Sequence, residues 1–208
     1  MPASTPLARS KSAALARLLD SIPKGYNRYT SGTIKAEKVP ALAVKFHERY
    51  GIGCTPAQRI TRKKRGQASC ILIVFCPPSG DQAQWLMLAT QGTGLQGEAM
   101  RCVTDKPRLH WLGYELVRHP HKGTTRWTVR RPSADLAADH ALLAELMNKH
   151  HLSGVANFLQ RLANLPGFHG VRAQVWGLFQ AARSRGYDAE LPHLFYMQKI
   201  SHGERLAL

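Results

Sequence analysis

The sequence predicts an α+β fold in which an antiparallel β-sheet lies between helices at the two ends of the chain. Three observations indicate this. Apolar residues recur at helical spacing before residue 66 and after residue 132, whereas apolar runs of strand length occupy residues 67–131. No long helical pattern separates those runs, which favours an antiparallel meander or hairpin sheet. We therefore expect one domain over residues 1–208, with a helical part (1–66), a sheet (67–131) and a second helical part (132–208).

The N-terminal part is expected to contain three helices. Leucine and isoleucine at helical spacing predict the first over residues 10–22, and a second apolar stripe predicts another over residues 39–50. Residues 24–38, which are mostly polar and basic, are expected to form the loop between them. A short third helix should begin after Thr55 and end at Gly66.

The third helix follows the second after a short glycine-containing turn and is strongly basic. Thr55 is a suitable N-cap, and Gln58 is placed to complete a capping box. The outline is typical of a helix-turn-helix, whose second helix enters the major groove of DNA. The alternatives are contact with phosphates alone, or a solvated basic surface. The candidate nucleic-acid-binding residues of this helix are Gln58, Arg59, Arg62, Lys63, Lys64 and Arg65.

The segment 109–131 is predicted to be a basic β-hairpin. Two runs of alternating apolar residues, 109–117 and 124–131, flank a tip at residues 118–123. Alternation places Trp127 on the core side of the second strand and Arg126 on the other side, which can stay solvated. The residues of this hairpin expected to meet phosphates are Arg118, Lys122, Arg126 and Arg130.

The remaining elements follow from the same patterns. The continuous apolar run at residues 69–76 should be a central strand that is covered on both faces. Residues 84–90 and 99–103 are the next candidate strands. After the sheet, helices are predicted over residues 133–149, from Ser153 to the break at Pro166, and over residues 170–184.

The charge of the chain points to an anionic partner. Its 208 residues include 29 Lys and Arg against 13 Asp and Glu, a formal net charge of +16. Such an excess favours nucleic acid, an anionic membrane surface or an acidic protein. No apolar run approaches the roughly 20 residues of a membrane span, and no signal peptide is recognisable, so we expect a cytoplasmic protein. In that compartment the four cysteines, which form no C-x-x-C pair, are expected to be small buried residues and not zinc ligands or disulfides.

Motifs for catalysis are sparse. Residues 92–97 match G-x-G-x-x-G, but no helix is expected to open there, so we interpret them as a loop between strands. His119 and His121 form a His-x-His pair that could hold a divalent metal in a nuclease, given a third ligand and a nucleophilic tyrosine. Acidic residues are too scattered for a two-metal centre. We assign no catalytic residue, no metal ligand and no cofactor, and we favour a binding protein over an enzyme.

Two stretches carry a resemblance to known proteins. The run RLHWLGYELVRHPHKG with TTRWTVRRP, and the later run LPGFHGVRAQVWGLFQAA, resemble a family of uncharacterised accessory proteins from integrating conjugative elements and broad-host-range plasmids. The resemblance implies a bacterial mobile element as the setting, and it carries over no functional residue.

The expected function is non-enzymatic binding of nucleic acid, most plausibly DNA, whether single- or double-stranded, by this basic protein. A first alternative is a plasmid-encoded inhibitor of conjugation that contacts a protein of the transfer machinery. A second is a metal-dependent nuclease that uses His119 and His121. The sequence gives no indication of the oligomeric state.

Overall fold

The chain forms two compact units, and the computed structural model describes residues 3–78, 80–121, 123–197 and 203–208. Unit 1 comprises Met1–Pro107 and Ile200–Leu208, and unit 2 comprises Arg108–Lys199. Unit 2 is therefore inserted into the chain of unit 1. Both units contain helices and strands, so the α+β class is confirmed. The boundary falls inside residues 67–131, where one sheet was expected and two are found.

Unit 1 is built on a six-stranded sheet with the order β5-β2-β4-β3-β1-β9. The paired neighbours run antiparallel except β1 and β3, which are parallel, so the sheet is mixed and not the simple antiparallel meander that was expected. The helices and strands of unit 1 are β1 (Ser4–Ala8), α1 (Lys11–Ser21), η1 (Ile22–Lys24), β2 (Arg28–Lys35), η2 (Ala36–Lys38), α2 (Val39–Tyr50), α3 (Pro56–Lys64), β3 (Cys70–Phe75), β4 (Gln82–Ala89), β5 (Arg101–Cys102) and β9 (Arg205–Ala207).

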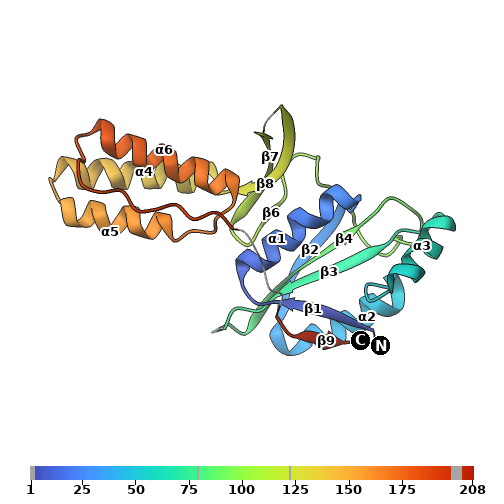
Figure 1. Ribbon diagram of the computed structural model, residues 1–208. Coiled ribbons are helices and arrows are strands. Elements are labelled where there is room, and N and C mark those ends of the chain that lie inside the picture. The colour runs from blue at the N-terminus through green and yellow to red at the C-terminus, as the bar shows by residue number, and fades with distance from the viewer. Residues whose placement is uncertain (1–2, 79, 122, 198–202) are drawn as a thin grey trace. The chain divides into compact units, whose positions relative to one another are not determined.

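The core of unit 1 lies on both faces of β3. All six residues of this strand are buried, which confirms the prediction of a central strand. Cys70, Leu72 and Val74 share one apolar cluster with Phe46 and Tyr50 of α2. The intervening residues of β3 point to the opposite face, which α1 covers (Figure 1).

The expected loop at residues 24–38 is wrong, because most of it is strand β2. Its residues are polar and include Gly32, so the segment has low intrinsic strand propensity. Pairing with β4 over the full length of β2 supplies the missing stabilisation. Gly32 lies opposite Trp85, and a Cβ at this glycine would come within 2.8 Å of the indole ring. The strand therefore depends on a partner about fifty residues further along the chain.

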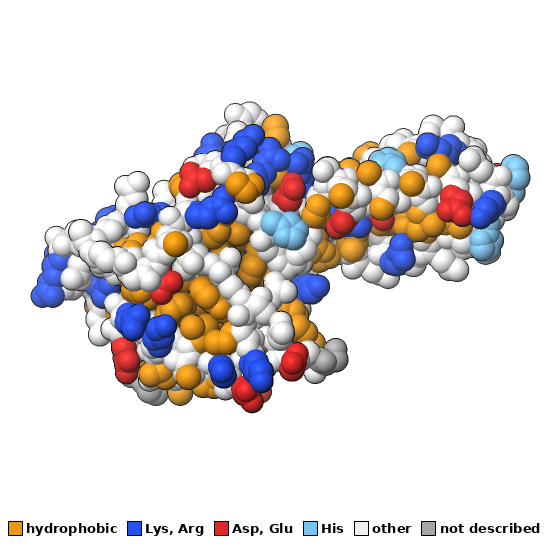
Figure 2. Space-filling view, turned by 180° about the vertical axis from the view of Figure 1, so that it is seen from behind, with side chains coloured by type: hydrophobic (Ala, Val, Ile, Leu, Met, Phe, Trp, Pro, Cys, Tyr) orange, Lys and Arg blue, Asp and Glu red, His pale blue; other side chains and the backbone are white. Residues whose placement is uncertain are grey.

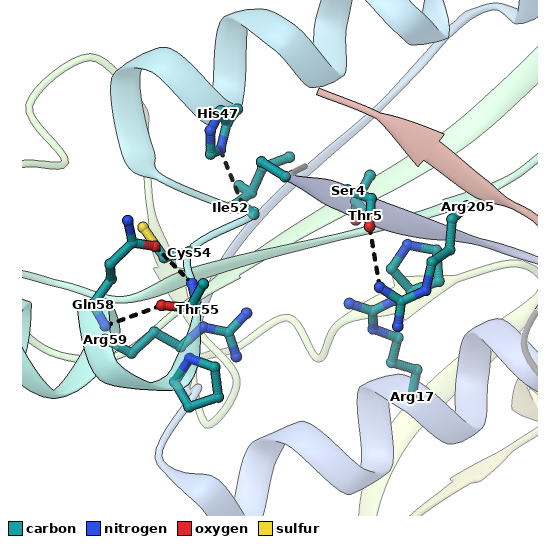
Figure 3. Close-up of a pocket in the computed structure, with 14 residues that line it drawn as sticks. Ser4, Thr5, Arg17, His47, Ile52, Cys54, Thr55, Gln58, Arg59 and Arg205 are labelled. Atoms are coloured by element: carbon teal, nitrogen blue, oxygen red, sulfur yellow. Dashed lines mark hydrogen bonds between the residues drawn. The ribbon is translucent and has the colours of Figure 1, made fainter. Parts of the chain in front are cut away.

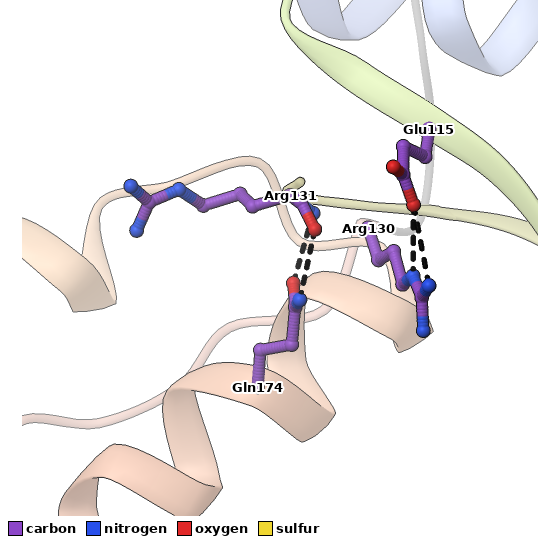
Figure 4. Close-up of polar contacts among 4 residues, drawn as sticks. All are labelled: Glu115, Arg130, Arg131 and Gln174. Carbon is purple, nitrogen blue, oxygen red and sulfur yellow. Dashed lines mark hydrogen bonds and ion pairs between the residues drawn. The ribbon is translucent and has the colours of Figure 1, made fainter. Parts of the chain in front are cut away.

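Unit 2 combines a three-stranded antiparallel sheet, in the order β6-β7-β8, with three helices. Its elements are β6 (His110–Trp111), β7 (Tyr114–His121), β8 (Thr124–Arg130), α4 (Ser133–Asn148), α5 (Leu152–Ala163) and α6 (His169–Ser184), and the helices lie close to their predicted positions. Helix α6 packs on β8: Gly170 N donates to Thr128 Oγ1 at 3.1 Å, and the Gln174 amide bonds both backbone groups of Arg131 (Figure 4). Over the described ranges, no helix combines the length and apolar character needed to cross a membrane.

The hairpin forms with a different geometry from the one predicted. The first run is broken after Trp111 by Leu112 and Gly113, both at positive φ (53° and 84°), so that β6 turns tightly into β7. Strand β7 then continues through the segment expected to be the tip and reaches His121, which pairs with Thr124. The paired ends of β7 and β8 therefore lie closer together along the chain than the predicted tip at residues 118–123 would allow.

Candidate nucleic-acid interface

The start of α3 is fixed by its own side chains. Thr55 Oγ1 accepts from Gln58 N at 3.3 Å, and Gln58 Oε1 accepts from Thr55 N at 2.8 Å. This is the predicted capping box, and it satisfies a backbone donor at each end of the first turn. Because the Gln58 carbonyl oxygen is committed to the cap, this residue is poorly suited to reading the edge of a base.

Helix α3 does not have the packing of a recognition helix. None of its residues is buried, and Ile60 is 58% exposed. In a helix-turn-helix the recognition helix is held in place by an apolar face against its neighbours. The two helices and the turn between them form as predicted, but α3 lacks this inner face. We therefore describe α3 as an exposed basic helix and not as a groove-reading helix.

The positive side chains of α3 and its end differ in what they contact. Arg62 Nε donates to the carbonyl of Ala68 at 3.1 Å, so this guanidinium holds the following loop in place. Lys63, Lys64 and Arg65 are exposed, and none of them pairs with a carboxylate in the part of the chain that the structure describes. Their position at the helix C-terminus is favourable for the helix dipole. They are also free to meet an external anion.

The hairpin of β7 and β8 carries positive side chains in Figure 2, but these are partly neutralised. Arg130 donates to Glu115 Oε2 at 3.2 Å through two nitrogens (Figure 4). The Arg118 guanidinium lies 4.7 Å from the centre of the Trp127 ring, where the ring face attracts it. Arg126 is exposed on the β8 side opposite His119. Lys122 lies outside the described residues.

The face of β8 expected to be solvated is only partly so. Thr128, on the same side as Arg126 and Arg130, is 4% exposed because α6 covers it. Trp127 on the other side is half-buried and Val129 is buried. Unit 2 therefore uses both sides of β8 for packing, and the solvated basic part of the hairpin is restricted to its distal end.

The two motifs considered for catalysis differ in their surroundings. The His119 ring stacks on His169 at 5.7 Å, the His169 ring lies 5.2 Å from that of Tyr196, and the side chain of His121 lies outside the described residues. The described ranges contain no group of three or more His, Cys, Asp and Glu that could hold a metal ion. The glycine loop is fixed by backbone bonds, in which Thr93 N donates to Gly66 O and Ala68 N donates to Thr93 O. No helix opens after this loop, as expected.

A cavity of about 680 Å³ lies at the N-terminus of α3 in unit 1. Three guanidinium groups line it: Arg17 from α1, Arg59 from α3 and Arg205 from β9 (Figure 3). In the same view Arg59 extends from one side, and Arg17 and Arg205 lie together on the other. The residues that line this cavity include no Asp or Glu. Arg59 was a candidate from the sequence, whereas Arg17 and Arg205 were missed.

Two of the three arginines that line this cavity have a buried nitrogen without a hydrogen-bond partner among the described residues. These atoms are Arg17 Nη1 and Arg59 Nε. Arg205 Nη1 donates to Ser4 Oγ at 3.0 Å. Burial, followed by the charges of Arg59 and Arg205, lowers the pKa of Arg17 to about 10. Desolvation and like charges therefore both disfavour the positive form of Arg17.

The sequence contained one sign of this site. Arg17 stands four residues after Ala13 and four before Ser21, both of which are buried on the core side of α1. A positive residue within an apolar stripe must be paired, or must reach a polar cavity. Arg205 gave no such sign, because β9 was not predicted and pairs with a strand two hundred residues earlier.

Comparisons with known proteins add no relative. No protein-family model, no curated protein and no solved structure matches this chain.

Proposed function

We propose that the protein binds nucleic acid without catalysing a reaction on it, and that α3 provides the main contact with the phosphate backbone. The observation that carries this proposal is that most of the positive side chains of α3 have no partner within the described residues. Among the described residues, Lys63, Lys64 and Arg65 at one end of the helix are exposed and pair with no carboxylate, and Arg59 Nε at its other end has no hydrogen-bond partner. Phosphates neutralised by such groups release counterions, which drives binding that is independent of base sequence.

The contacts of the candidate residues indicate which of them are available to bind phosphates. Arg62 and Gln58 stabilise α3 and the loop that follows it, so they are supporting residues. In the hairpin, Arg126 remains an available contact, whereas Arg130 is neutralised by Glu115. The proposed setting is a bacterial mobile element, and DNA is the proposed form of nucleic acid.

A charge-reversal pair tests this proposal. The variant K63E/K64E/R65E should bind single- and double-stranded oligonucleotides about a hundredfold more weakly at low salt, with the slope of log affinity against log salt reduced by about 3. The matched control is K11E/K38E/K45E, which changes the net charge equally at exposed positions of unit 1 away from α3. The control should lose less than about tenfold, because only the long-range field changes. Equal losses in the two variants, or no loss in the first, would exclude α3 as the interface.

A second candidate function is contact with a protein, as in the conjugation inhibitor considered above. One observation favours it: Trp176, Phe195 and Tyr196 of unit 2 are 52%, 71% and 54% exposed. Trp176 and Tyr196 also line a cavity of about 600 Å³ in unit 2. Large exposed aromatic side chains are enriched at protein interfaces, although they also stack on unpaired bases. The variant W176A/Y196A separates these roles, since base stacking predicts weaker binding of single strands alone and a protein contact predicts unchanged binding of both nucleic acids.

A further inference from the structure

The cavity of unit 1 that Arg17, Arg59 and Arg205 line is positively charged, and no carboxylate among its lining residues balances that charge. Three guanidinium groups from three elements converge on it. Two of their nitrogens are buried without a partner in the described part of the chain. Buried donors of this kind are costly unless something accepts from them. Like charges at close range add to that cost.

We propose that this cavity binds a phosphate monoester with two negative charges, such as the phosphate at the end of a nucleic-acid strand. This inference deepens the proposed function and rests on it only for the identity of the strand. The anion would lie between Arg59 on one side and the Arg17 and Arg205 pair on the other, in the space that Figure 3 shows between them.

The donors fit a phosphate better than a smaller anion. A guanidinium presents its N–H groups as a planar fork that matches two phosphate oxygens. A monoester has three terminal oxygens, and three arginines supply forks from the two sides of the cavity. The first turn of α3 also lines the cavity, and the partial positive charge of a helix N-terminus adds to the attraction. The open donors of Arg17 and Arg59 are independent evidence for a ligand at this helix end.

Charge and shape favour a terminal phosphate over one inside a strand. A monoester carries about −1.5 to −2 near pH 7, whereas an internal diester carries −1, so the monoester balances the three arginines more closely. An internal phosphate would also need its two neighbouring sugars to leave the cavity on separate sides. Among the lining residues the only ring able to stack on a base is that of His47, and its Nδ1 already accepts from Gly53 N at 3.2 Å. The cavity is therefore suited to the phosphate and not to the base.

The position of Arg59 connects this cavity with the basic helix. Arg59 belongs to the first turn of α3, whereas Lys63, Lys64 and Arg65 are at the other end of the same helix. At about 1.5 Å per residue, the four to six residues from Arg59 to Lys63 and Arg65 span about 6 to 9 Å along the helix axis, or about two nucleotides of a strand at about 3.4 Å each. A strand whose end is held at Arg59 could therefore follow α3 and meet the exposed lysines.

The experiment compares oligonucleotides of one sequence with a phosphate or a hydroxyl at the 5′ end, and then at the 3′ end. The protein should bind an oligonucleotide with a phosphorylated end about tenfold more tightly than one without it. This ratio corresponds to about 1.4 kcal/mol of binding free energy, which the charge-assisted hydrogen bonds of the arginines can supply. R17M, R59M and R205M should each reduce this preference to less than twofold. R65M, which removes an equal charge from the exposed end, should weaken all four oligonucleotides alike and leave the preference unchanged.

A measurement on the unaltered protein covers the case in which a variant fails to fold. At low millimolar concentration, where the general stabilising effect of an excluded salt is small, inorganic phosphate should raise the unfolding temperature more than chloride does at equal ionic strength, because it binds the folded state. No difference between phosphate and chloride, together with no preference for phosphorylated ends, would overturn the inference.

The outcomes for the two proposals are separable. Salt-dependent binding through Lys63, Lys64 and Arg65 without a preference for phosphorylated ends would overturn the cavity assignment and leave the proposed function intact. Stabilisation by inorganic phosphate that R17M abolishes, without measurable binding of any oligonucleotide, would support the cavity and overturn the proposed function.

Discussion

Each of the two units places an arginine on the inner side of a helix, and the surroundings of these two residues are opposite. In unit 2, Arg172 of α6 is 3% exposed and donates to the carbonyls of Ala163, Leu165 and Phe195 at 3.0, 3.0 and 2.8 Å. In unit 1, Arg17 of α1 has a buried nitrogen without a partner in the described residues, and its main charged neighbours are two further arginines. Burial is the leading cause that lowers the pKa of both groups, and for Arg17 the charges of two other arginines lower it further.

The difference teaches how a structural arginine can be told from a binding arginine. A guanidinium whose donors are all accepted by backbone carbonyls already has its role, which in unit 2 is to join the segment after α5 and the segment after α6 to the helix. A guanidinium that is buried, surrounded by like charge and left with an open donor destabilises the protein until an anion arrives. Burial alone would have grouped the two residues together.

The largest expected effect comes from the structural arginine. R172M should lower the free energy of unfolding of the protein by about 4 kcal/mol, because three carbonyls lose a charged donor in a buried position. Urea denaturation followed by circular dichroism measures this. Stabilisation by inorganic phosphate should persist in whatever fraction remains folded. A loss below about 1 kcal/mol would show that water can replace the guanidinium, and Arg172 would then not be a structural arginine.

The corresponding change in unit 1 should have the opposite sign. R17M keeps the length of the side chain and removes the unpartnered charge, so without phosphate the free energy of unfolding should rise by about 1 kcal/mol or remain unchanged. The same urea titration, repeated with phosphate, should show that the variant no longer gains stability from the anion. A loss of more than about 2 kcal/mol without phosphate would assign Arg17 a structural role like that of Arg172.

The pH dependence of that difference sharpens the test. Below pH 10, Arg17 is charged in the folded and in the unfolded protein, so folding bears the full penalty of its burial. Between about pH 10 and the higher pKa that arginine has in the unfolded chain, the unfolded chain binds a proton that the folded protein has lost, and this group's contribution to stability rises with pH. The advantage of R17M over the natural protein should therefore be present at pH 8 and smaller at pH 11.

The smallest expected effect concerns the hairpin. E115Q should cost less than about 1 kcal/mol, because Arg130 is 39% exposed and its ion pair is partly screened by solvent. The change frees the Arg130 charge, so affinity for nucleic acid should increase by about two- to threefold if the hairpin contributes to binding. An oligonucleotide titration at low salt checks this, with E145Q as the control, since the exposed Glu145 pairs with Lys149 on α4. An unchanged affinity would confine binding to unit 1.

Local sequence signals predicted those parts of the fold that are fixed by nearby residues. Helix α2 has the predicted bounds because Pro40 suits its first turn and Gly51 takes the left-handed conformation (φ 66°) that ends it. A Cβ at Gly51 would also come within 2.7 Å of Cys54 Sγ. The capping box at Thr55 and the fully buried strand β3 were likewise readable from short windows of sequence.

Strands that are made by distant pairing could not be predicted in this way. Segments β1, β2 and β9 are short or polar, and each becomes a strand only because a neighbour supplies its hydrogen bonds. The residues of the candidate site also differ in whether local sequence or distant pairing places them. Arg59 could be predicted because it lies in a basic helix, whereas Arg205 reaches the cavity only through the pairing of β9 with β1. The topology of the sheet, and not the composition of any window, brings the three arginines together.

The insertion of unit 2 into unit 1 has a consequence for the order of assembly. Strand β1 pairs with β3 on one side and with β9 on the other, and about 130 residues that include all of unit 2 separate β3 from β9. Until β9 returns, β1 exposes the bare edge of an otherwise formed sheet, which is a hazard for association between chains. The interval during which that edge is unprotected therefore includes at least the time needed to synthesise the inserted segment.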